Sequence, residues 1–409
     1  MGKLREKVVH PFYFWLILIV SFLTIWGYGA QRVIAPIQME TMGTGILMIG
    51  VFLSLFGLPR AVMDIVGGHL ADHFSKKNNI ILSLLLSGVI SIFFIGISQT
   101  SLAIGLWRVV MGVGLSWSQT AILAYLAELT APSIRGTAFG VQKMATWLGI
   151  ALAGLAAPFF LHFISLTALM LGLALLSLLG IALIAFFLHD VDRDAVSSPV
   201  AEKKPVSLHS RPNVNFFKKI VLSLNGCITK VVEDGLVTFF LPIYILSQYD
   251  NLIATGLVIS IFTVIYVISQ PLGGILADRI GSWPVIGIGL LFILIAVLLL
   301  SFSNELSYLY VFSVIAGLGS GITATSAEMR ASLIGSAQRR SRTLGHWRFF
   351  RDMGSVFGPL LIGALWGIGD EEFIPYVVAF LILVSMLLTF WVIYDDQRNG
   401  STRRMRAKK

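Results

Sequence analysis

The chain has 409 residues, of which 56% are hydrophobic and 12% charged, and its formal net charge is +9. Because soluble proteins carry about 25% charged residues, this composition excludes an ordinary soluble domain and indicates membrane-spanning helices. The only cysteine, Cys227, excludes an internal disulfide. The seven histidines are scattered and the sequence has no nucleotide-binding loop, so we expect no metal, no cofactor, no ATP-driven step and no enzymatic chemistry.

Twelve apolar runs are long enough to cross a bilayer as helices, which takes about 20 residues each. No run alternates as a barrel strand does, so we predict an all-α polytopic protein. The first run is too long for a cleavable signal peptide and is therefore the first span. In chain order, the predicted spans are 11–35, 44–71, 79–98, 102–129, 137–162, 164–188, 215–247, 252–277, 283–303, 306–332, 343–368 and 373–394.

The lysines and arginines outside these spans all fall on one side of the predicted membrane, whereas Glu40, Asp250 and Glu305 lie on the other. The positive-inside rule therefore places both termini in the cytoplasm. The net charge of +9 then reflects orientation and contact with anionic lipid, not binding of nucleic acid. The predicted organisation is a six-helix bundle over 1–189, a cytoplasmic linker over 190–214, a second six-helix bundle over 215–396 and a basic cytoplasmic tail over 397–409.

The chain repeats itself at about half its length. GHLADHFSKK begins at Gly68, and GILADRIGSW begins at Gly274. Three further regions share the offset within one residue. They pair Gly29 and Pro36 with Gly235 and Pro242, Gly112 and Gly114 with Gly317 and Gly319, and Gly140, Lys143 and Gly149 with Gly345, Arg348 and Gly354. Such a repeat in an apolar chain predicts two pseudo-symmetric bundles that enclose one path.

These features resemble the major facilitator superfamily of secondary transporters, and the resemblance covers essentially the whole chain. The family's loop between helices 2 and 3 reads Gly-x-x-x-Asp-(Arg/Lys)-x-Gly-(Arg/Lys)-(Arg/Lys). The matching residues are Gly68, Asp72, Lys76 and Lys77 in the first copy and Gly274, Asp278, Arg279 and Gly281 in the second. The departures are His73 and Ser75 in the first copy and Ser282 and Trp283 in the second.

The resemblance implies that this loop latches the cytoplasmic gate. A helix N-terminus carries a partial positive charge, which a carboxylate can neutralise. Asp72 is then expected to meet the start of helix 11, and Asp278 the start of helix 5. Arg342 and Arg135, at those two starts, are the natural ion-pair partners. Glu128, near the cytoplasmic end of helix 4, is a further gate candidate.

A second pattern bears on the direction of transport. Exporters of this superfamily often carry Gly-x8-Gly-x3-Gly-Pro-x3-Gly in helix 5. Helix 5 here holds only its first part, from Gly140 to Gly149, whereas helix 11 holds the full pattern from Gly345 to Gly363. The displaced pattern favours export over uptake.

Charges inside the spans are functional candidates, because a charge at mid-bilayer costs at least ~2.5–3.5 kcal/mol on insertion scales. Three pairs lie one helical turn apart and can neutralise each other, namely Arg60–Asp64, Lys230–Asp234 and Arg348–Asp352. Glu233 adds a second acid beside Lys230, so one carboxylate there lacks a full local partner and can exchange a proton. The proton-coupling candidates are therefore Glu233 and Asp234 first, then Asp64 and Asp352.

Basic residues outnumber acidic ones inside the spans, and helix 1 carries Arg32 but no acid. This balance favours a small anionic, zwitterionic or amphiphilic organic solute over a lipophilic cation. The candidate substrate-binding residues are Arg32, Arg60, Arg108, Lys143, Lys230, Arg348 and Arg351.

The sequence thus predicts a monomeric secondary transporter in the cytoplasmic membrane that works by alternating access. Its expected partners are a small-molecule solute, a coupling H⁺ and membrane lipids. Export by antiport is favoured. The alternatives are proton-coupled uptake, flipping of a lipid or amphiphile, and solute sensing without transport.

Overall fold

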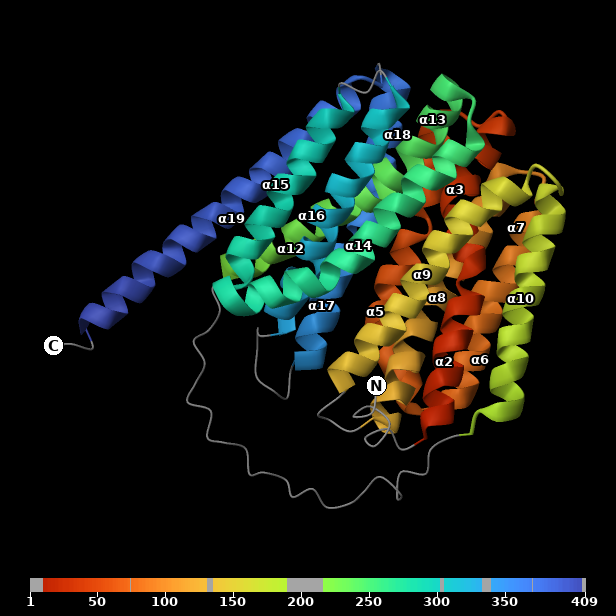
Figure 1. The fold of residues 1–409 in the computed structure, drawn as a ribbon, viewed down its shortest axis with the longest axis horizontal. Coiled ribbons are helices and arrows are strands. Elements are labelled where there is room, and N and C mark those ends of the chain that lie inside the picture. The colour runs from red at the N-terminus through yellow and green to blue at the C-terminus, as the bar shows by residue number, and fades with distance from the viewer. Residues whose placement is uncertain are drawn as a thin grey trace.

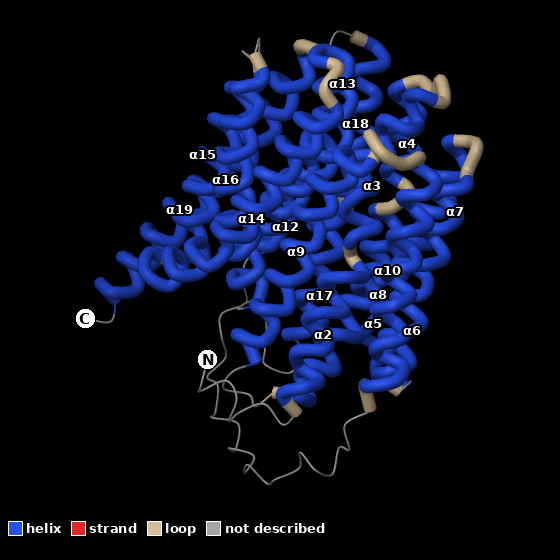
Figure 2. The backbone as a smooth tube through the Cα atoms, turned by 45° about the vertical axis from the view of Figure 1, so that its right-hand side comes forward, coloured by secondary structure: helices blue, strands red, loops and turns tan. Residues whose placement is uncertain are grey.

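The computed structural model describes residues 10–73, 75–130, 135–189, 216–301, 305–332, 340–369 and 371–406. Within these residues every regular element is a helix (Figure 2). This confirms the expected all-α class. The predicted linker, 190–214, lies outside the described residues.

The N-terminal half forms the right-hand bundle in Figure 1. Two of its predicted spans are interrupted, the first at Ile25 and the second between Ser54 and Gly57. Gly57 and Pro59 follow the second interruption, and a proline inside a helix removes a backbone hydrogen bond. The elements are α2 (Pro11–Thr24), α3 (Trp26–Thr41), α4 (Ile46–Ser54), α5 (Gly57–His73), α6 (Lys76–Leu84), the π-helical η1 (Leu85–Ile90), α7 (Ser91–Ile97), α8 (Ser101–Leu129), α9 (Arg135–Phe160) and α10 (Leu166–Phe187).

The C-terminal half forms the left-hand bundle. Its last helix continues to Arg406, beyond the predicted span end at 394, because extending an existing helix costs little even through polar residues. The elements are α12 (Phe216–Lys230), the π-helical η2 (Val231–Phe240), α13 (Leu241–Tyr249), α14 (Leu252–Ile280), α15 (Ser282–Leu300), α16 (Leu306–Ser332), α17 (Arg340–Asp352), α18 (Gly354–Ile368) and α19 (Phe373–Arg406).

Ten helices of the described chain are long and apolar enough to cross a membrane. Two further helical runs, 216–249 and 340–368, overlap the predicted spans 7 and 11. Each carries three closely spaced charges, Lys230, Glu233 and Asp234 in one and Arg348, Arg351 and Asp352 in the other. The prediction of twelve spans depends on counting these two charged runs.

The repeated glycines pack in the same way in the two halves. A Cβ at Gly112 would lie 2.5 Å from the carbonyl oxygen of Phe56, which joins α4 to α5, and one at Gly317 would lie 2.6 Å from that of Phe262 in α14. Gly149 and Gly354 are likewise equivalent, since Gly149 packs against the end of α2 and Gly354 packs against the end of α12. Equivalent glycines therefore make equivalent close approaches, as a duplicated bundle requires.

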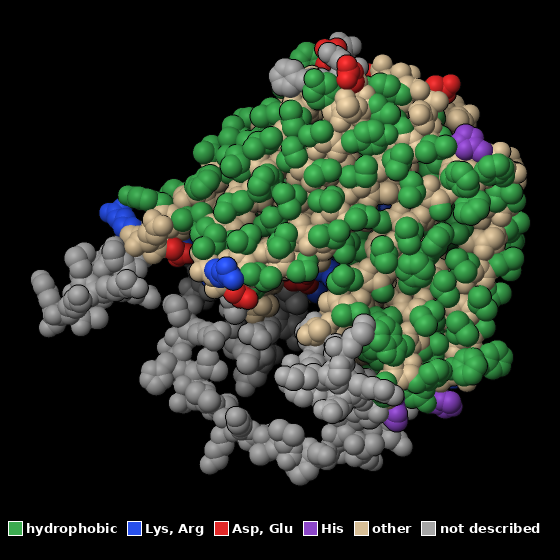
Figure 3. Space-filling view, viewed as in Figure 1, with side chains coloured by type: hydrophobic (Ala, Val, Ile, Leu, Met, Phe, Trp, Pro, Cys, Tyr) green, Lys and Arg blue, Asp and Glu red, His purple; other side chains and the backbone are tan. Residues whose placement is uncertain are grey.

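The two ends of the molecule differ in charge (Figure 3). We call the end at which α2 begins and α19 ends the basic end, because its described residues include Lys76, Lys77, Lys218, Arg279 and Arg398. At the opposite, acidic end, Glu40 lies in the last turn of α3, and the described connections hold Asp250, Glu305, Glu371 and Glu372 and no lysine or arginine. This asymmetry supports the predicted orientation with the basic end in the cytoplasm.

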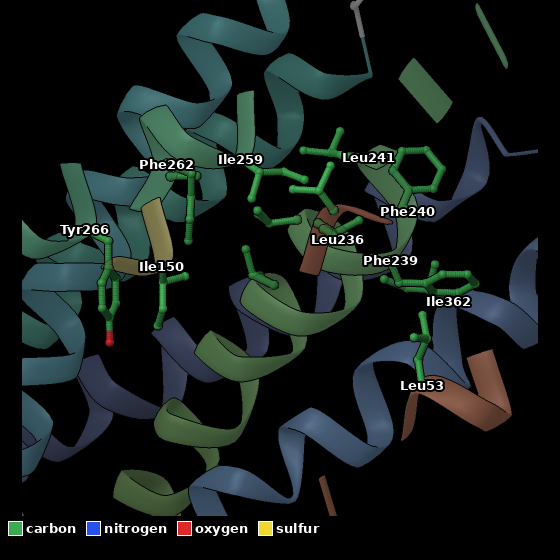
Figure 4. Close-up of a cluster of buried hydrophobic side chains, with 14 of the residues drawn as sticks. Leu53, Ile150, Leu236, Phe239, Phe240, Leu241, Ile259, Phe262, Tyr266 and Ile362 are labelled. Atoms are coloured by element: carbon green, nitrogen blue, oxygen red, sulfur yellow. The ribbon is translucent and has the colours of Figure 1, made fainter. Parts of the chain in front are cut away.

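A buried apolar cluster joins the halves toward the acidic end (Figure 4). Leu53 and Ile150 contribute from the N-terminal half, and Phe239, Phe262 and Ile362 from the C-terminal half. Small residues allow the backbones to meet beside it. A Cβ at Gly256 in α14 would lie only 2.7 Å from the carbonyl oxygen of Gly154 in α9. The path between the halves is therefore sealed toward the acidic end.

Candidate functional site: a charged cavity between the halves

A small cavity lies between the halves below this seal. It has a volume of about 30 Å³, which holds only one or two water molecules. Lys143 of α9 lines it from the N-terminal half, and Lys230, Glu233, Glu328 and Arg351 line it from the C-terminal half. Among the described residues, no group of three His, Cys, Asp or Glu side chains is placed to hold a metal ion.

The first ion cluster surrounds Glu233 in η2. Its carboxylate lies 2.8 Å from Lys230 Nζ and 3.8 Å from Arg32 Nη2 of the opposite half. Arg32 also donates to Thr238 Oγ1, at 3.0 Å from Nη2 and 3.2 Å from Nε. Thr238 Oγ1 in turn donates to the Glu233 carbonyl oxygen five residues earlier, at 2.9 Å. This link matches the π-helical winding, which often marks functional sites.

An aromatic wall completes this cluster. The Trp147 ring centroid lies 5.9 Å from Arg32 Cζ and 6.0 Å from Lys230 Nζ, so both cations face one ring. Tyr266 packs against Trp147 with ring centroids 4.8 Å apart. Contacts of a cation with an aromatic face gain strength where water is excluded, and they hold the two halves around a common centre.

The second cluster surrounds Asp352, which is fully buried. Arg351 Nε lies 2.5 Å from Asp352 Oδ1, and Arg60 Nε of the opposite half lies 3.3 Å from Oδ2. The expected pairs Arg60–Asp64 and Arg348–Asp352 are therefore wrong, because Arg60 contacts Asp352 of the other half and Arg348 contacts Glu328 of α16. The expected Lys230–Asp234 pair is present at 3.9 Å.

The third cluster surrounds Glu328 of α16. Lys143 Nζ lies 3.1 Å from Oε2, and Arg348 Nη2 lies 2.5 Å from Oε1. Because Lys143 belongs to α9, this cluster also joins the halves. These side chains are partly exposed, at 43% for Lys143, 32% for Arg348 and 24% for Glu328, whereas those of Arg32 and Glu233 are 1% and 3% exposed. The site is therefore more open toward the basic end.

Two acids have a serine as a direct hydrogen-bond partner. Ser355 Oγ donates to Asp234 Oδ2 at 2.5 Å, and Ser116 Oγ donates to Asp64 Oδ1 at 2.7 Å. The other Asp64 oxygen, Oδ2, is buried and has no hydrogen-bond partner. Sequence reasoning missed Ser116, Ser355 and Thr238, because nothing in their local sequence distinguishes them from other small polar residues of a membrane helix.

Arg108 in α8 differs from the other basic candidates. Its side chain is buried, at 3% exposure, and its Nε and Nη1 have no hydrogen-bond partner. Its guanidinium group lies over the Phe56 ring, with the ring centroid 5.3 Å from Cζ. The other six candidates each lie within 4.0 Å of a carboxylate. No feature of the sequence around Arg108 indicates that it lacks the carboxylate partner that the others have.

The expected latch is only partly visible. Gly68 and Asp72 belong to α5, but the side chain of Asp72 lies outside the described residues, as do those of Arg135 and Arg342. Asp278 and Arg279 are exposed beside Gly274 at the end of α14. Lys76 pairs with Glu128 of the same half, and Lys77 Nζ donates to the Ala185 carbonyl oxygen at 2.7 Å. The latch between the halves therefore stays a prediction.

The chain is similar in sequence to known membrane transporters. The sequence model of the Major Facilitator Superfamily matches residues 17–250 and 231–409. An uncharacterised transporter of this type from Methanocaldococcus jannaschii is 23% identical over 95% of the chain and 98% of its own length. A multidrug resistance efflux pump homologue from Lactococcus lactis is 24% identical over 84% of each chain.

A solved structure shows the same fold. The crystal structure of a bacterial homologue of the human lysosomal transporter Spinster, inward-facing and unoccupied, superposes with a TM-score of 0.75. It is 16% identical and covers 93% of this chain and 96% of its own. The chain is thus an integral, multi-pass membrane protein that belongs to the major facilitator superfamily, whose members are transporters and not enzymes.

Proposed function

We propose that this protein is a secondary active transporter for a small organic anion, with zwitterions or anionic amphiphiles as variants of that class. The observation that carries the proposal is Arg108, a buried guanidinium without a carboxylate partner. Arg32 adds a second free donor, because its Nη1 is buried without a hydrogen-bond partner. Asp234 and Arg32 are both near enough to act on Arg108 electrostatically.

Buried, unpaired guanidinium groups are costly, because removing a charge from water is repaid only by a counter-charge and by hydrogen bonds. A carboxylate or another oxyanion supplies both, since its oxygens accept from the guanidinium N–H groups. Tyr28 stacks on Phe56, with ring centroids 5.3 Å apart, beside Arg108. This aromatic surface suits a solute that combines an acidic group with an apolar body.

Alternating access explains how such a solute would reach the two arginines. The cavity of about 30 Å³ is too small for an organic solute, so the halves must move apart to bind one. The seal toward the acidic end and the partly exposed Lys143–Glu328–Arg348 cluster support an inward-facing state. The opposite state would part the Gly154–Gly256 contact and open the path to Arg108.

We further propose proton coupling and export, with both termini in the cytoplasm. Buried carboxylates provide sites for a coupling ion. Export is favoured by the glycine pattern of helix 11 and by the likeness to a multidrug efflux pump homologue. Uptake by proton symport is the second candidate. Flux into proteoliposomes under imposed pH gradients of either sign, screened across aromatic and aliphatic carboxylates and anionic amphiphiles, distinguishes the two.

Arg108→Gln should weaken binding of the transported anion by roughly tenfold or more, because it removes a charge-assisted hydrogen bond. The unfolding temperature should not fall, since no ion pair is lost. Competition of unlabelled anion against labelled anion in proteoliposomes measures the affinity. Arg330→Gln is the matched control, because Arg330 also lies over an aromatic ring, that of Trp283 at 5.6 Å, but far toward the basic end. Equal affinity in both variants, or tight binding of cations only, would contradict the anion assignment.

A further inference from the structure

The carboxylates around the path between the halves differ in their counter-charges. Each of Glu233, Asp234, Glu328 and Asp352 lies within 4.0 Å of at least one lysine or arginine. Asp64 has no ion pair among the described side chains. It accepts one hydrogen bond from the neutral Ser116, at 2.7 Å, and leaves Oδ2 buried and unpartnered.

The arginines near Asp64 are held elsewhere. Arg60, one turn earlier in α5, directs its Nε to Asp352 at 3.3 Å, and Arg351 directs its Nε to the same carboxylate at 2.5 Å. The charged groups that act electrostatically on Asp64 are Arg60, Arg351 and Asp352. On the other elements packed against α5, the described charged or titratable side chains are Lys76 and Lys77 of α6, Arg108, Tyr125 and Glu128 of α8, and His346 and Arg348 of α17; α4 and α18 hold none.

A carboxyl group with a buried oxygen that neither a hydrogen bond nor a cation reaches is better suited to its neutral form than are carboxylates that lie within 4.0 Å of a lysine or arginine. Protonation places the hydrogen on Oδ2, removes the uncompensated charge and leaves the Ser116 hydrogen bond to Oδ1 in place. Asp64 also sits where the halves touch, since a Cβ on Gly345 of α17 would lie 3.9 Å from the Asp64 carbonyl oxygen. A change in the charge of Asp64 therefore changes the energy of a contact between the halves.

We infer that Asp64, and not Glu233 or Asp234 of η2, is the side chain that binds and releases the coupling proton. This assignment rests on the proposed function of proton-coupled transport. It reverses the order of the proton-coupling candidates expected from sequence. That order assumed that Arg60 neutralises Asp64 and that one of the two acids beside Lys230 has no full partner. The reversal follows from the contact of Arg60 with Asp352, which only the crossing of α5 and α17 creates.

Infrared spectroscopy of the purified protein in lipid tests the assignment without any substrate. A protonated carboxyl group has a C=O stretch that shifts in D₂O and disappears as the group ionises. Such a band should disappear as the pH is raised, and it should be absent from Asp64→Asn. Asp234→Asn is the matched control, because Asp234 also accepts from one serine but has Lys230 at 3.9 Å; it should retain the band.

A second variant guards against a folding artefact, since Asp64→Glu should keep a titrating band at a changed frequency. A band that persists in Asp64→Asn, or that vanishes in Asp234→Asn, would overturn the assignment. The proposed function is judged separately, by flux in proteoliposomes. Absence of anion flux with the Asp64 band intact would refute transport of anions and leave the proton site standing. Gradient-driven flux that survives in Asp64→Asn would instead refute the coupling role.

Discussion

Gly50→Trp should reduce transport to the background rate, because it prevents the halves from closing at the acidic end. A Cβ at Gly50 of α4 would already overlap the carbonyl oxygen of Pro359 in α18, and Gly363 lies against the same spot. An indole ring there cannot coexist with the packed interface. The protein should therefore remain open toward the acidic end, with its binding residues accessible from that side only. Gly256→Trp should act alike, since its Cβ would lie 2.7 Å from the Gly154 carbonyl oxygen.

A labelling assay reports the conformational change itself. Ser260 is 5% exposed and donates to the Ala151 carbonyl oxygen across the interface at 2.8 Å. In a Cys227→Ser background, a Ser260→Cys probe should resist a membrane-impermeant maleimide, and should react once Gly50→Trp is added. Gly140→Trp is the matched control, because a Cβ at Gly140 meets nothing within 4 Å. Transport by Gly50→Trp at the rate of this control would show that the seal is not part of the cycle.

Asp352→Asn should lower the free energy of unfolding by about 3–5 kcal/mol, the usual effect of removing one partner of a buried ion pair. Arg351 and Arg60 would both lose their carboxylate, and Arg60 belongs to the other half. The loss should appear in chemical or thermal unfolding in detergent, and transport should fall with it. A second change, Arg60→Gln, should restore part of the stability, because it removes one of the stranded charges.

A surface ion pair provides the comparison. Asp396 lies 2.6 Å from Lys218 Nζ, but its side chain is 45% exposed. Water and salt screen such a pair, so Asp396→Asn should cost at most about 1 kcal/mol. Equal losses for Asp352→Asn and Asp396→Asn would mean that the central cluster is well hydrated and that its charges are not held in a low-dielectric environment.

The helical spans and their duplication were readable from the sequence for a physical reason. In lipid each helix must satisfy its own backbone and present apolar side chains, so the requirement is local and leaves a continuous pattern. The repeated glycines carried the second signal. Gly112 and Gly317 recur at the same offset because each allows a close helix approach at an equivalent place. The distribution of basic residues likewise agreed with the two ends of the molecule.

The pairing of the buried charges was not readable in the same way. Arg60 and Asp64 are one turn apart, yet Arg60 binds Asp352 and Asp64 accepts from Ser116. Lys230 and Asp234, at the same spacing, do lie together, at 3.9 Å. Spacing along one helix predicts only which side chains can meet, whereas a neighbouring helix offers partners that are hundreds of residues away in sequence.

The amino-acid sequence therefore contains the fold class, the duplication and the list of charged residues, because these depend on the solvent around each helix and on local periodicity. The tertiary structure decides which of these charges neutralise each other, through the crossing of α5 and α17 and the approach of α3 to η2. Arg108 and Asp64 differ from the other buried charged residues because neither has a described, oppositely charged side chain within ion-pair distance. This difference arises only when the two halves pack together, because the energy of a charge in low dielectric depends on all the groups around it.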